Sequence, residues 1–273
     1  MTINCKGNLV DLSSPKVMGI LNITPDSFFD GGKYKDETAI LHQVDKMLTD
    51  GATLIDVGAY SSRPGAAHIS EDEELKRIIP VINLLIKNYP EIIISVDTFR
   101  SKVAEATVNS GAAIINDISG GTMDDKMFAT VANLQVPYIL MHMLGTPQNM
   151  QQNPVYEDVT KEIISFFAKQ IFELHQLKVN DVIIDVGFGF GKTIAHNYEI
   201  LSNLELFKSL DAPILAGISR KSMLYKTLGI SAQEALNATT SANTIALLNG
   251  ANILRVHDVK EAVEAIKIVE QVN

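Results

Sequence analysis

Polar residues stand at the ends of most short apolar runs in this chain, and their types suggest its chemistry. These run-end residues are Asn22, Asp56, Asp97, Asn116, Asp117, Met141-His142, Asp185, Lys221, Arg255 and His257. Aspartate and asparagine can hold a flat heterocycle that offers N–H donors, such as a 2-amino-4-oxo ring. Lysine, arginine and histidine can hold an anion such as pyrophosphate. The set predicts a site that binds a ring and an anion and acts by electrostatic stabilisation.

A structural role is the competing interpretation for each polar residue taken alone. An aspartate or serine after a strand often caps the following helix, and we expect Ser222 and Asp258 to be such caps. We expect His142 to be structural, and Arg100 and Lys102 to lie on a solvated face. A buried carboxylate is costly unless it is paired. A cluster of several carboxylates with basic groups is therefore not needed for folding alone, and it indicates a functional site.

The glycine-rich stretch D-V-G-F-G-F-G-K-T (185–193) resembles a phosphate-binding loop but departs from the known patterns. A P-loop would need glycine at position 186, which is Val186. The dinucleotide-binding pattern also fails, because Lys192 stands where its last glycine would be. The alternative is a tight turn between a strand and a helix, for which glycine supplies the backbone freedom.

Eight apolar runs, each followed by a longer stretch, would position these residues. The runs cover 17–23, 53–59, 92–97, 113–118, 136–142, 182–187, 213–219 and 252–257. Runs that are rich in Ile and Val and apolar throughout are typical of parallel strands buried on both faces. Apolar residues at helical spacing in 155–177 and 258–270 indicate helices, and Asp258 with Glu261 resembles a capping box. Gly51 would end an earlier helix.

Eight strand–helix units in about 250 residues predict a single (β/α)8 TIM barrel, with 1–273 as one domain. A doubly wound sheet is the alternative. We expect residues 1–12, which precede the first run, to cover the bottom of the barrel. The site of such a barrel lies at the carboxyl ends of its strands, where the run-end residues would meet. The long irregular stretches 24–36 and 60–70 are expected to be functional loops.

Composition excludes several classes of protein. The formal net charge of −9 at pH 7 argues against binding to nucleic acid or to acidic membranes. The single cysteine, Cys5, rules out an internal disulfide framework and fits a reducing compartment. No run approaches the ~20 apolar residues of a membrane span, and the N-terminus lacks the pattern of a signal peptide. We expect a cytoplasmic protein.

Motifs along nearly the whole chain resemble those of the bacterial dihydropteroate synthase family. M-G-I-L-N-I-T-P-D-S-F-F-D-G-G (18–32) resembles the first signature and S-S-R-P-G (61–65) the second. The later motifs are S-V-D-T, I-N-D-I, L-M-H-M-L-G-T-P, D-V-G-F-G-F-G-K, S-R-K-S and R-V-H-D-V. The resemblance implies a homodimeric, Mg²⁺-dependent barrel enzyme of folate synthesis. It would join 6-hydroxymethyl-7,8-dihydropterin pyrophosphate to 4-aminobenzoate, giving 7,8-dihydropteroate and pyrophosphate.

The resemblance also implies roles for individual residues. The pterin is expected on Asp97, Asn116, Asp185 and Lys221, with Met141 also binding substrate. Asn22 would contact Mg²⁺. Pyrophosphate would be held by Arg255 and His257, with Ser62 and Arg63 on the second loop. The 4-aminobenzoate side would comprise Phe28, Pro64, Phe190, Lys221 and Ser222. The catalytic residues would be Asp97, Lys221, Arg255 and His257.

Two departures from the family's pattern and two other functions stay open. Val186 stands where the family usually has proline, and Ala59-Tyr60 replaces Gly-Glu before the second loop. One alternative is a methyltransferase that passes a methyl group from a folate-type pterin to a corrinoid protein. It should lack T-P-D-S-F, which is present here. The other is a non-enzymatic pterin-binding domain, which would tolerate loss of Lys221 or Arg255.

Overall fold

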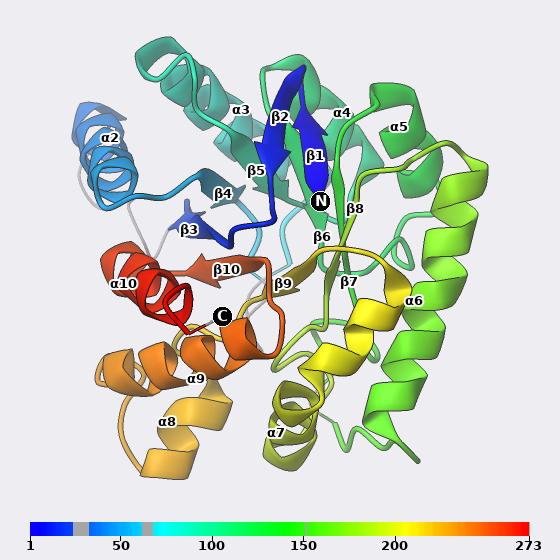
Figure 1. Ribbon diagram of the computed structural model, residues 1–273. Coiled ribbons are helices and arrows are strands. Elements are labelled where there is room, and N and C mark those ends of the chain that lie inside the picture. The colour runs from blue at the N-terminus through cyan, green and yellow to red at the C-terminus, as the bar shows by residue number, and fades with distance from the viewer. Residues whose placement is uncertain (24–32, 62–67, 151, 273) are drawn as a thin grey trace.

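The chain folds into a closed barrel of eight parallel strands surrounded by helices (Figure 1). A computed structural model describes residues 1–23, 33–61, 68–150 and 152–272. In ring order the strands are β3 (Lys16–Asn22), β4 (Leu54–Gly58), β5 (Ile94–Asp97), β6 (Ile114–Asp117), β7 (Tyr138–Met141), β8 (Val182–Asp185), β9 (Ile214–Ala216) and β10 (Ile253–Val256). β10 pairs with β3 and closes the ring. The predicted (β/α)8 barrel is confirmed, and the doubly wound sheet is wrong because an open sheet has no closing pair.

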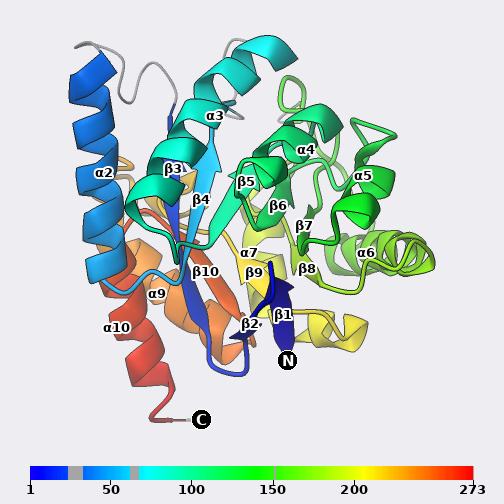
Figure 2. The same cartoon turned by 90° about the horizontal axis from the view of Figure 1, so that it is seen from above.

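Helices form the outer layer around the strands (Figure 2). They are α2 (Lys33–Thr49), α3 (Glu71–Asn88), α4 (Ser101–Asn109), α5 (Met127–Leu134), α6 (Val159–Gln176), α7 (Ile194–Ser202), α8 (Ser222–Leu228), α9 (Leu236–Leu248) and α10 (Val259–Val269), with a 3-10 helix η1 (Leu204–Leu210). Apolar spacing sets which face each helix buries. In α6, Val159, Ile163 and Phe167 are buried, as the pattern of 155–177 predicts. No helix among the described residues is long and apolar enough to cross a membrane.

The amino end of the barrel is closed by an antiparallel hairpin of β1 (Thr2–Cys5) and β2 (Asn8–Asp11). Its buried residues and the adjoining Leu12 pack against side chains inside the barrel. The cluster contains Ile3, Cys5, Val10, Leu12, Met18, Leu54, Ala113, Ile114, Ile139, Ile183, Leu215 and Ile253. Most of its members on barrel strands lie within the first two residues of their strands, so the expectation that 1–12 covers the barrel bottom is confirmed.

Three local expectations are wrong, and for Asp258 and Arg100 the reason is a long-range partner that holds the side chain. Asp258 precedes α10 but makes no capping bond, since its carboxylate accepts two hydrogen bonds of 2.8 Å from the guanidinium of Arg220. A charged bidentate partner is stronger than a peptide N–H. Ser222 is the first residue of α8, and Lys221 occupies the N-cap position. Arg100 is buried and forms an ion pair with Glu74.

Candidate active site

Four polar side chains meet inside the barrel, from β4, β5, β6 and β10. Arg255 Nε donates to Asp56 Oδ2 at 2.6 Å, and Arg255 Nη2 donates to Asp97 Oδ2 at 3.1 Å. Asn116 Nδ2 donates to the same Asp56 oxygen at 3.1 Å. Asp97 and Asn116 are direct neighbours in the strand register. The structure therefore brings the predicted residues Asp97, Asn116 and Arg255 together in one cluster.

Asp56 is the member of this cluster that the family motifs do not single out. Its side chain is fully buried, with an exposed fraction of 0%, and it binds both Arg255 and Asn116. Its signal in the sequence is a carboxylate within the apolar run T-L-I-D-V-G-A, where a charge requires a partner. Identifying that partner requires the fold, because Arg255 lies 199 residues away along the chain.

Burial and charge together tune the acid–base properties of this cluster. Burial raises the pKa of Asp97 to about 7, and the Asp56 carboxylate adds to the rise while Arg255 opposes it. Burial lowers the pKa of Arg255, but Asp56 and Asp97 more than offset it and keep the guanidinium charged. Asp97 therefore exchanges its proton near neutral pH beside a permanent cation.

A second group of predicted residues lies at the end of β8 and on the loops after β8 and β9. Asp185 Oδ1 accepts a hydrogen bond from Gly187 N at 2.8 Å. The Lys221 ammonium donates to the Phe188 carbonyl and lies 4.4 Å from the centroid of the Phe190 ring. Burial lowers the pKa of Lys221 to about 8, with Asp185 opposing the shift, and burial raises the pKa of Asp185. A carboxylate and an ammonium thus interact with each other, and the ammonium also contacts an aromatic ring.

Several buried acceptors in the barrel have no hydrogen-bond partner among the described residues. They include Asp56 Oδ1, Asn116 Oδ1 and the hydroxyl oxygen of Ser95. Ser95 is the register neighbour of Asp56 on β5. Orphaned buried polar groups are costly and need an explanation. A ring that offers N–H donors would satisfy the carboxylate and amide oxygens.

The remaining predicted residues lie around this centre or outside the described chain. Met141 is buried in a cluster that Phe190 also joins. His257 is exposed, and its Nδ1 lies 3.0 Å from the Ser219 hydroxyl. Ser222 is half-buried at the start of α8, and Asn22 is half-buried at the tip of β3. Phe28, Ser62, Arg63 and Pro64 lie outside the described residues.

The glycine-rich stretch after β8 lets that loop lie directly against the loop after β7. A Cβ on Gly187 would lie 2.0 Å from the His142 carbonyl oxygen, and one on Gly191 would lie 2.5 Å from the Leu144 carbonyl oxygen. Gly187, Gly189 and Gly191 all have positive φ, which other residues rarely adopt. These glycines permit a tight turn and a close approach of two loops, as the alternative to a phosphate cradle predicts.

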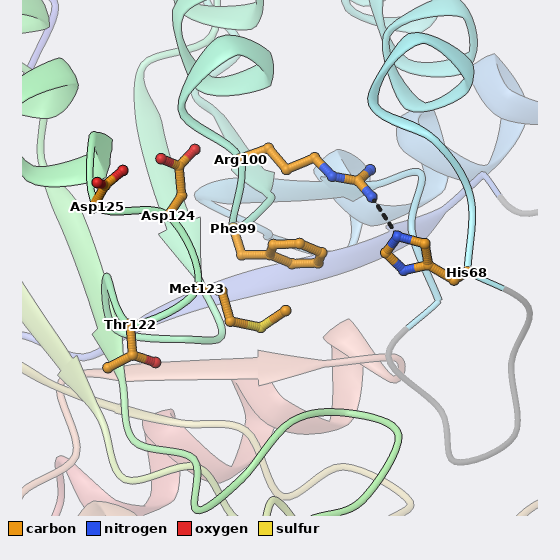
Figure 3. A pocket seen from close by; sticks show the side chains of 7 residues that line it. All are labelled: His68, Phe99, Arg100, Thr122, Met123, Asp124 and Asp125. Atoms are coloured by element: carbon orange, nitrogen blue, oxygen red, sulfur yellow. Dashed lines mark hydrogen bonds between the residues drawn. The ribbon is translucent and has the colours of Figure 1, made fainter.

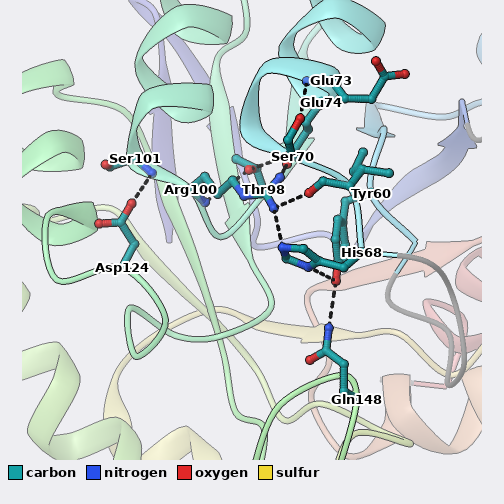
Figure 4. Close-up of polar contacts among 11 residues, drawn as sticks. Tyr60, His68, Ser70, Glu73, Glu74, Thr98, Arg100, Ser101, Asp124 and Gln148 are labelled. Atoms are coloured by element: carbon teal, nitrogen blue, oxygen red, sulfur yellow. Dashed lines mark hydrogen bonds and ion pairs between the residues drawn. The ribbon is translucent and has the colours of Figure 1, made fainter.

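A polar network at the rim surrounds Arg100 (Figure 4). Arg100 Nη2 donates to the Ile69 carbonyl at 2.6 Å and lies 3.3 Å from His68 Nε2, while Nη1 pairs with Glu74. The Tyr60 hydroxyl lies 3.2 Å from His68 Nδ1. Tyr60 stands where the resemblance implies glutamate. Its contact with His68 joins the chain before 62–67 to the chain after it.

An open cleft of about 600 Å³ lies beside this network. Figure 3 shows Phe99 and Met123 at the centre of its lining, with His68 and the Arg100 guanidinium to the right and Asp124 and Asp125 to the left.

Comparisons with known proteins find similar chains over nearly the whole length of this one. The family model described as "Pterin binding enzyme" matches residues 18–257. The dihydropteroate synthase of Escherichia coli (strain K12) is 43% identical, over 99% of this chain and 96% of that protein. The Yersinia pestis dihydropteroate synthase, solved with a sulfonamide drug, has a TM-score of 0.93 and 42% identity, covering 100% of this chain and 99% of that one. The Xanthomonas albilineans enzyme, solved with 4-aminobenzoic acid, has a TM-score of 0.92 and 37% identity, covering 99% and 97%.

Proposed function

Since the chain belongs to the pterin binding enzyme family, we propose how its barrel carries out the dihydropteroate synthase reaction. It is a transferase of folate synthesis. The reaction joins the methylene carbon of 6-hydroxymethyl-7,8-dihydropterin pyrophosphate to the amino nitrogen of 4-aminobenzoate. The named relatives give no support to the two alternatives, a corrinoid methyltransferase and a non-enzymatic binding domain.

The observation that carries the residue roles is the set of buried acceptors around Arg255. We assign the pterin to Asp97, Asn116 and Asp185, because a 2-amino-4-oxo ring presents N–H donors to such oxygens. Unpartnered oxygens on Asp56 and Asn116 support this placement. Lys221 and Phe190 lie beside Asp185 and suit the neighbouring ring of 4-aminobenzoate.

The carboxylate of Asp97 and the cation of Arg255 lie side by side, and this arrangement favours a dissociative path, in which the leaving group departs before the amine attacks. The C–O bond to pyrophosphate breaks, and the leaving group takes the electron pair while positive charge spreads over the pterin ring. The Asp97 carboxylate stabilises that cation. Arg255 and His257 hold the pyrophosphate, and the two contacts of Arg255 with Asp56 and Asp97 leave further guanidinium N–H groups for the anion. The aryl amine is neutral near pH 7, so it attacks without a strong base and then releases a proton.

A magnesium ion fits the rim next to this position. A Cβ on Gly58 would lie 3.7 Å from both Asn22 Oδ1 and Asp97 Oδ2, so two oxygen atoms of the kind that Mg²⁺ prefers flank this glycine. Asp97 Oδ2 already accepts a hydrogen bond from Arg255, which leaves Asn22 Oδ1 as the contact for the ion. The described residues contain no group of three or more His, Cys, Asp or Glu that could hold a metal alone. Mg²⁺ commonly uses one or two protein oxygens together with substrate phosphates. Asn22 would hold the ion, which would neutralise charge on the leaving pyrophosphate.

Calorimetry with pyrophosphate tests the metal assignment. Binding should strengthen with Mg²⁺ and weaken with EDTA, and Asn22→Ala should reduce that difference. Equal affinities with Mg²⁺ and with EDTA would refute the assignment.

We propose a homodimer through α7, α8 and α9. Large apolar side chains are exposed on these helices, which contact one another. They are Ile194, Tyr198, Leu228, Ile245 and Leu248. Such a patch suits a second copy of the chain. Light scattering should give the dimer mass, and Ile245→Lys with Leu248→Lys should give the monomer. A monomeric parent protein would refute the proposal.

We also propose that the protein is located in the cytoplasm. Its cysteine, Cys5, is a free thiol, as is usual in that reducing compartment.

Pyrophosphate release by the purified protein tests the function. Release should require both substrates, and Asp185→Ala should abolish it by weakening pterin binding by ~2–4 kcal/mol. Calorimetry on the folded variant would show the cause. Pterin affinity within about twofold of the parent protein would remove Asp185 from the site.

A further inference from the structure

Lys192 is a buried lysine that none of the assigned roles uses. Its exposed fraction is 3%, and its ammonium makes three hydrogen bonds. Nζ lies 3.0 Å from His142 Nδ1, 3.2 Å from the His142 carbonyl oxygen and 2.9 Å from the Phe190 carbonyl oxygen. An ammonium has three N–H groups, so these acceptors use all of them.

A buried ammonium without a carboxylate partner is an unusual choice for a loop. Among the described residues no carboxylate lies within ion-pair distance of Lys192. Burial lowers the pKa of Lys192 to about 7, with Asp185 opposing the shift and Lys221 adding to it. An apolar side chain would fill the same space without this desolvation. The three hydrogen bonds must therefore matter at this position.

The bonds connect the loop after β7 to the loop after β8. His142 is itself held edge-on against Phe166, with ring centroids 5.0 Å apart. Because Lys192 donates to Nδ1, the neutral His142 carries its proton on Nε2. On the other side, Lys192 holds the carbonyl of Phe190, whose ring faces the Lys221 ammonium at 4.4 Å. A fixed histidine thus determines, through Lys192, where the backbone of Phe190 lies.

We propose that Lys192 is a positioning residue for the second substrate, because it anchors Phe190 and so sets the Phe190 ring against Lys221. This inference rests on the proposed function, in which Phe190 and Lys221 flank 4-aminobenzoate. Lys192 itself touches neither substrate. The pterin acceptors Asp97 and Asn116 belong to β5 and β6 and are held by Asp56 and Arg255, away from Lys192. The third acceptor, Asp185, interacts electrostatically with Lys192 but takes its hydrogen bond from Gly187 N, so we expect the pterin pocket to depend on Lys192 much less than Phe190 does.

Steady-state kinetics with Lys192→Met tests the proposal. The substitution keeps a long side chain but removes every N–H donor. The KM for 4-aminobenzoate should rise by about tenfold, because the wall of its pocket is misplaced. The Kd of the pterin pyrophosphate should stay within about twofold. Val44→Ala is the matched control, since it removes buried volume from α2 and should change neither constant.

A spectroscopic readout follows the link without any turnover. The chain contains no tryptophan, so Phe190→Trp introduces the only indole. Adding Lys192→Met to that variant should move its emission to longer wavelength and increase quenching by acrylamide. Lys192→Gln, which keeps an amide donor, should have a smaller effect and serves as the second variant if Lys192→Met does not fold.

The outcomes separate this inference from the function on which it rests. A stability loss with an unchanged KM and unchanged emission would make Lys192 structural only. Equal changes in the KM for 4-aminobenzoate and the Kd of the pterin would also overturn the proposal, since Lys192 would then support the whole site. If the parent protein forms no product, the proposed function fails, while the emission of the two tryptophan variants still decides whether Lys192 positions residue 190.

Discussion

Among single residues, Arg255 is the cation that pairs with two buried carboxylates, Asp56 and Asp97. We expect Arg255→Ala to lower the free energy of unfolding by about 3 kcal/mol, because Asp56 and Asp97 would remain buried without their cation. Urea denaturation near pH 8 measures the loss. Lys161→Ala, which breaks an exposed pair with Asp158, is the control and should change little. Similar small effects in both variants would mean that the two acids tolerate isolation.

The pKa values of Asp97 and Lys221 predict a narrow pH optimum. The value of kcat/KM should rise as the pH passes about 7, because the role proposed for Asp97 requires its carboxylate to be ionised. It should fall as the pH passes about 8, because Lys221 then loses its charge. Initial rates measured across this pH range would show the predicted bell-shaped dependence of kcat/KM. Lys221→Arg should remove the alkaline limb, since guanidinium stays charged, and an unchanged limb would assign it to another group.

Sequence reasoning at this scale finds the polar run ends but not their partners. Asp97, Asn116 and Arg255 are identifiable because polar side chains at the ends of apolar runs are conspicuous. Their mutual contacts are not, because they depend on which strands are neighbours in the closed ring. Lys192 illustrates the limit, since its acceptor His142 lies 50 residues away and nothing in either local sequence indicates the pair.

At the scale of elements, the loop after β8 requires glycine at position 187 for two reasons that can be separated, the positive φ and the lack of space for a Cβ. Gly187 and Gly229 have nearly the same φ, +68° and +67°, but a Cβ on Gly229 meets nothing within 4 Å. Gly229→Ala should therefore cost only the backbone strain, about 1 kcal/mol. Gly187→Ala should cost ~2 kcal/mol more, because the new carbon collides with the His142 carbonyl. Thermal unfolding compares the two, and equal losses would show that the loops move apart easily.

Strands and helices are the part of the structure that the sequence predicts best. The run 182–187 contains β8, and 155–177 contains α6, because continuous apolar runs and helical spacing follow from burial alone. The run 213–219 extends beyond β9, which ends at Ala216, because Gly217 and Ile218 are buried without continuing the ladder. Caps are predicted less well, since Asp258 has a distant partner in Arg220.

For the whole molecule, the hairpin under the barrel should contribute to stability. Leu12 is fully buried there, whereas Leu9 on the same hairpin is 72% exposed. We expect Leu12→Ala to cost about 3 kcal/mol and Leu9→Ala less than about 0.5 kcal/mol. Urea denaturation of both variants provides the comparison. A small loss for Leu12→Ala would mean that the barrel interior is closed without the hairpin.

The count of strand–helix units predicts the architecture, while the positions of the loops around the mouth do not follow from it. Tyr60 is an example, because its contacts with His68 and Gln148 join parts of the chain that no periodic pattern relates. The barrel is predictable because its strands need each other to bury both faces. The positions of the rim loops depend instead on contacts between individual side chains.

The hairpin across the amino end has a consequence for which analogues of the substrates the protein can accept. Ile3, Val10 and Leu12 fill that end, so among the described residues the amino end gives no room for a ligand to extend. In the proposed placement, a substituent on the part of the pterin nearest Asp56 would meet packed side chains. A substituent on the far end of 4-aminobenzoate would extend into water. The protein should therefore accept larger analogues of 4-aminobenzoate and reject larger analogues of the pterin. The hairpin would set this difference without contacting either substrate.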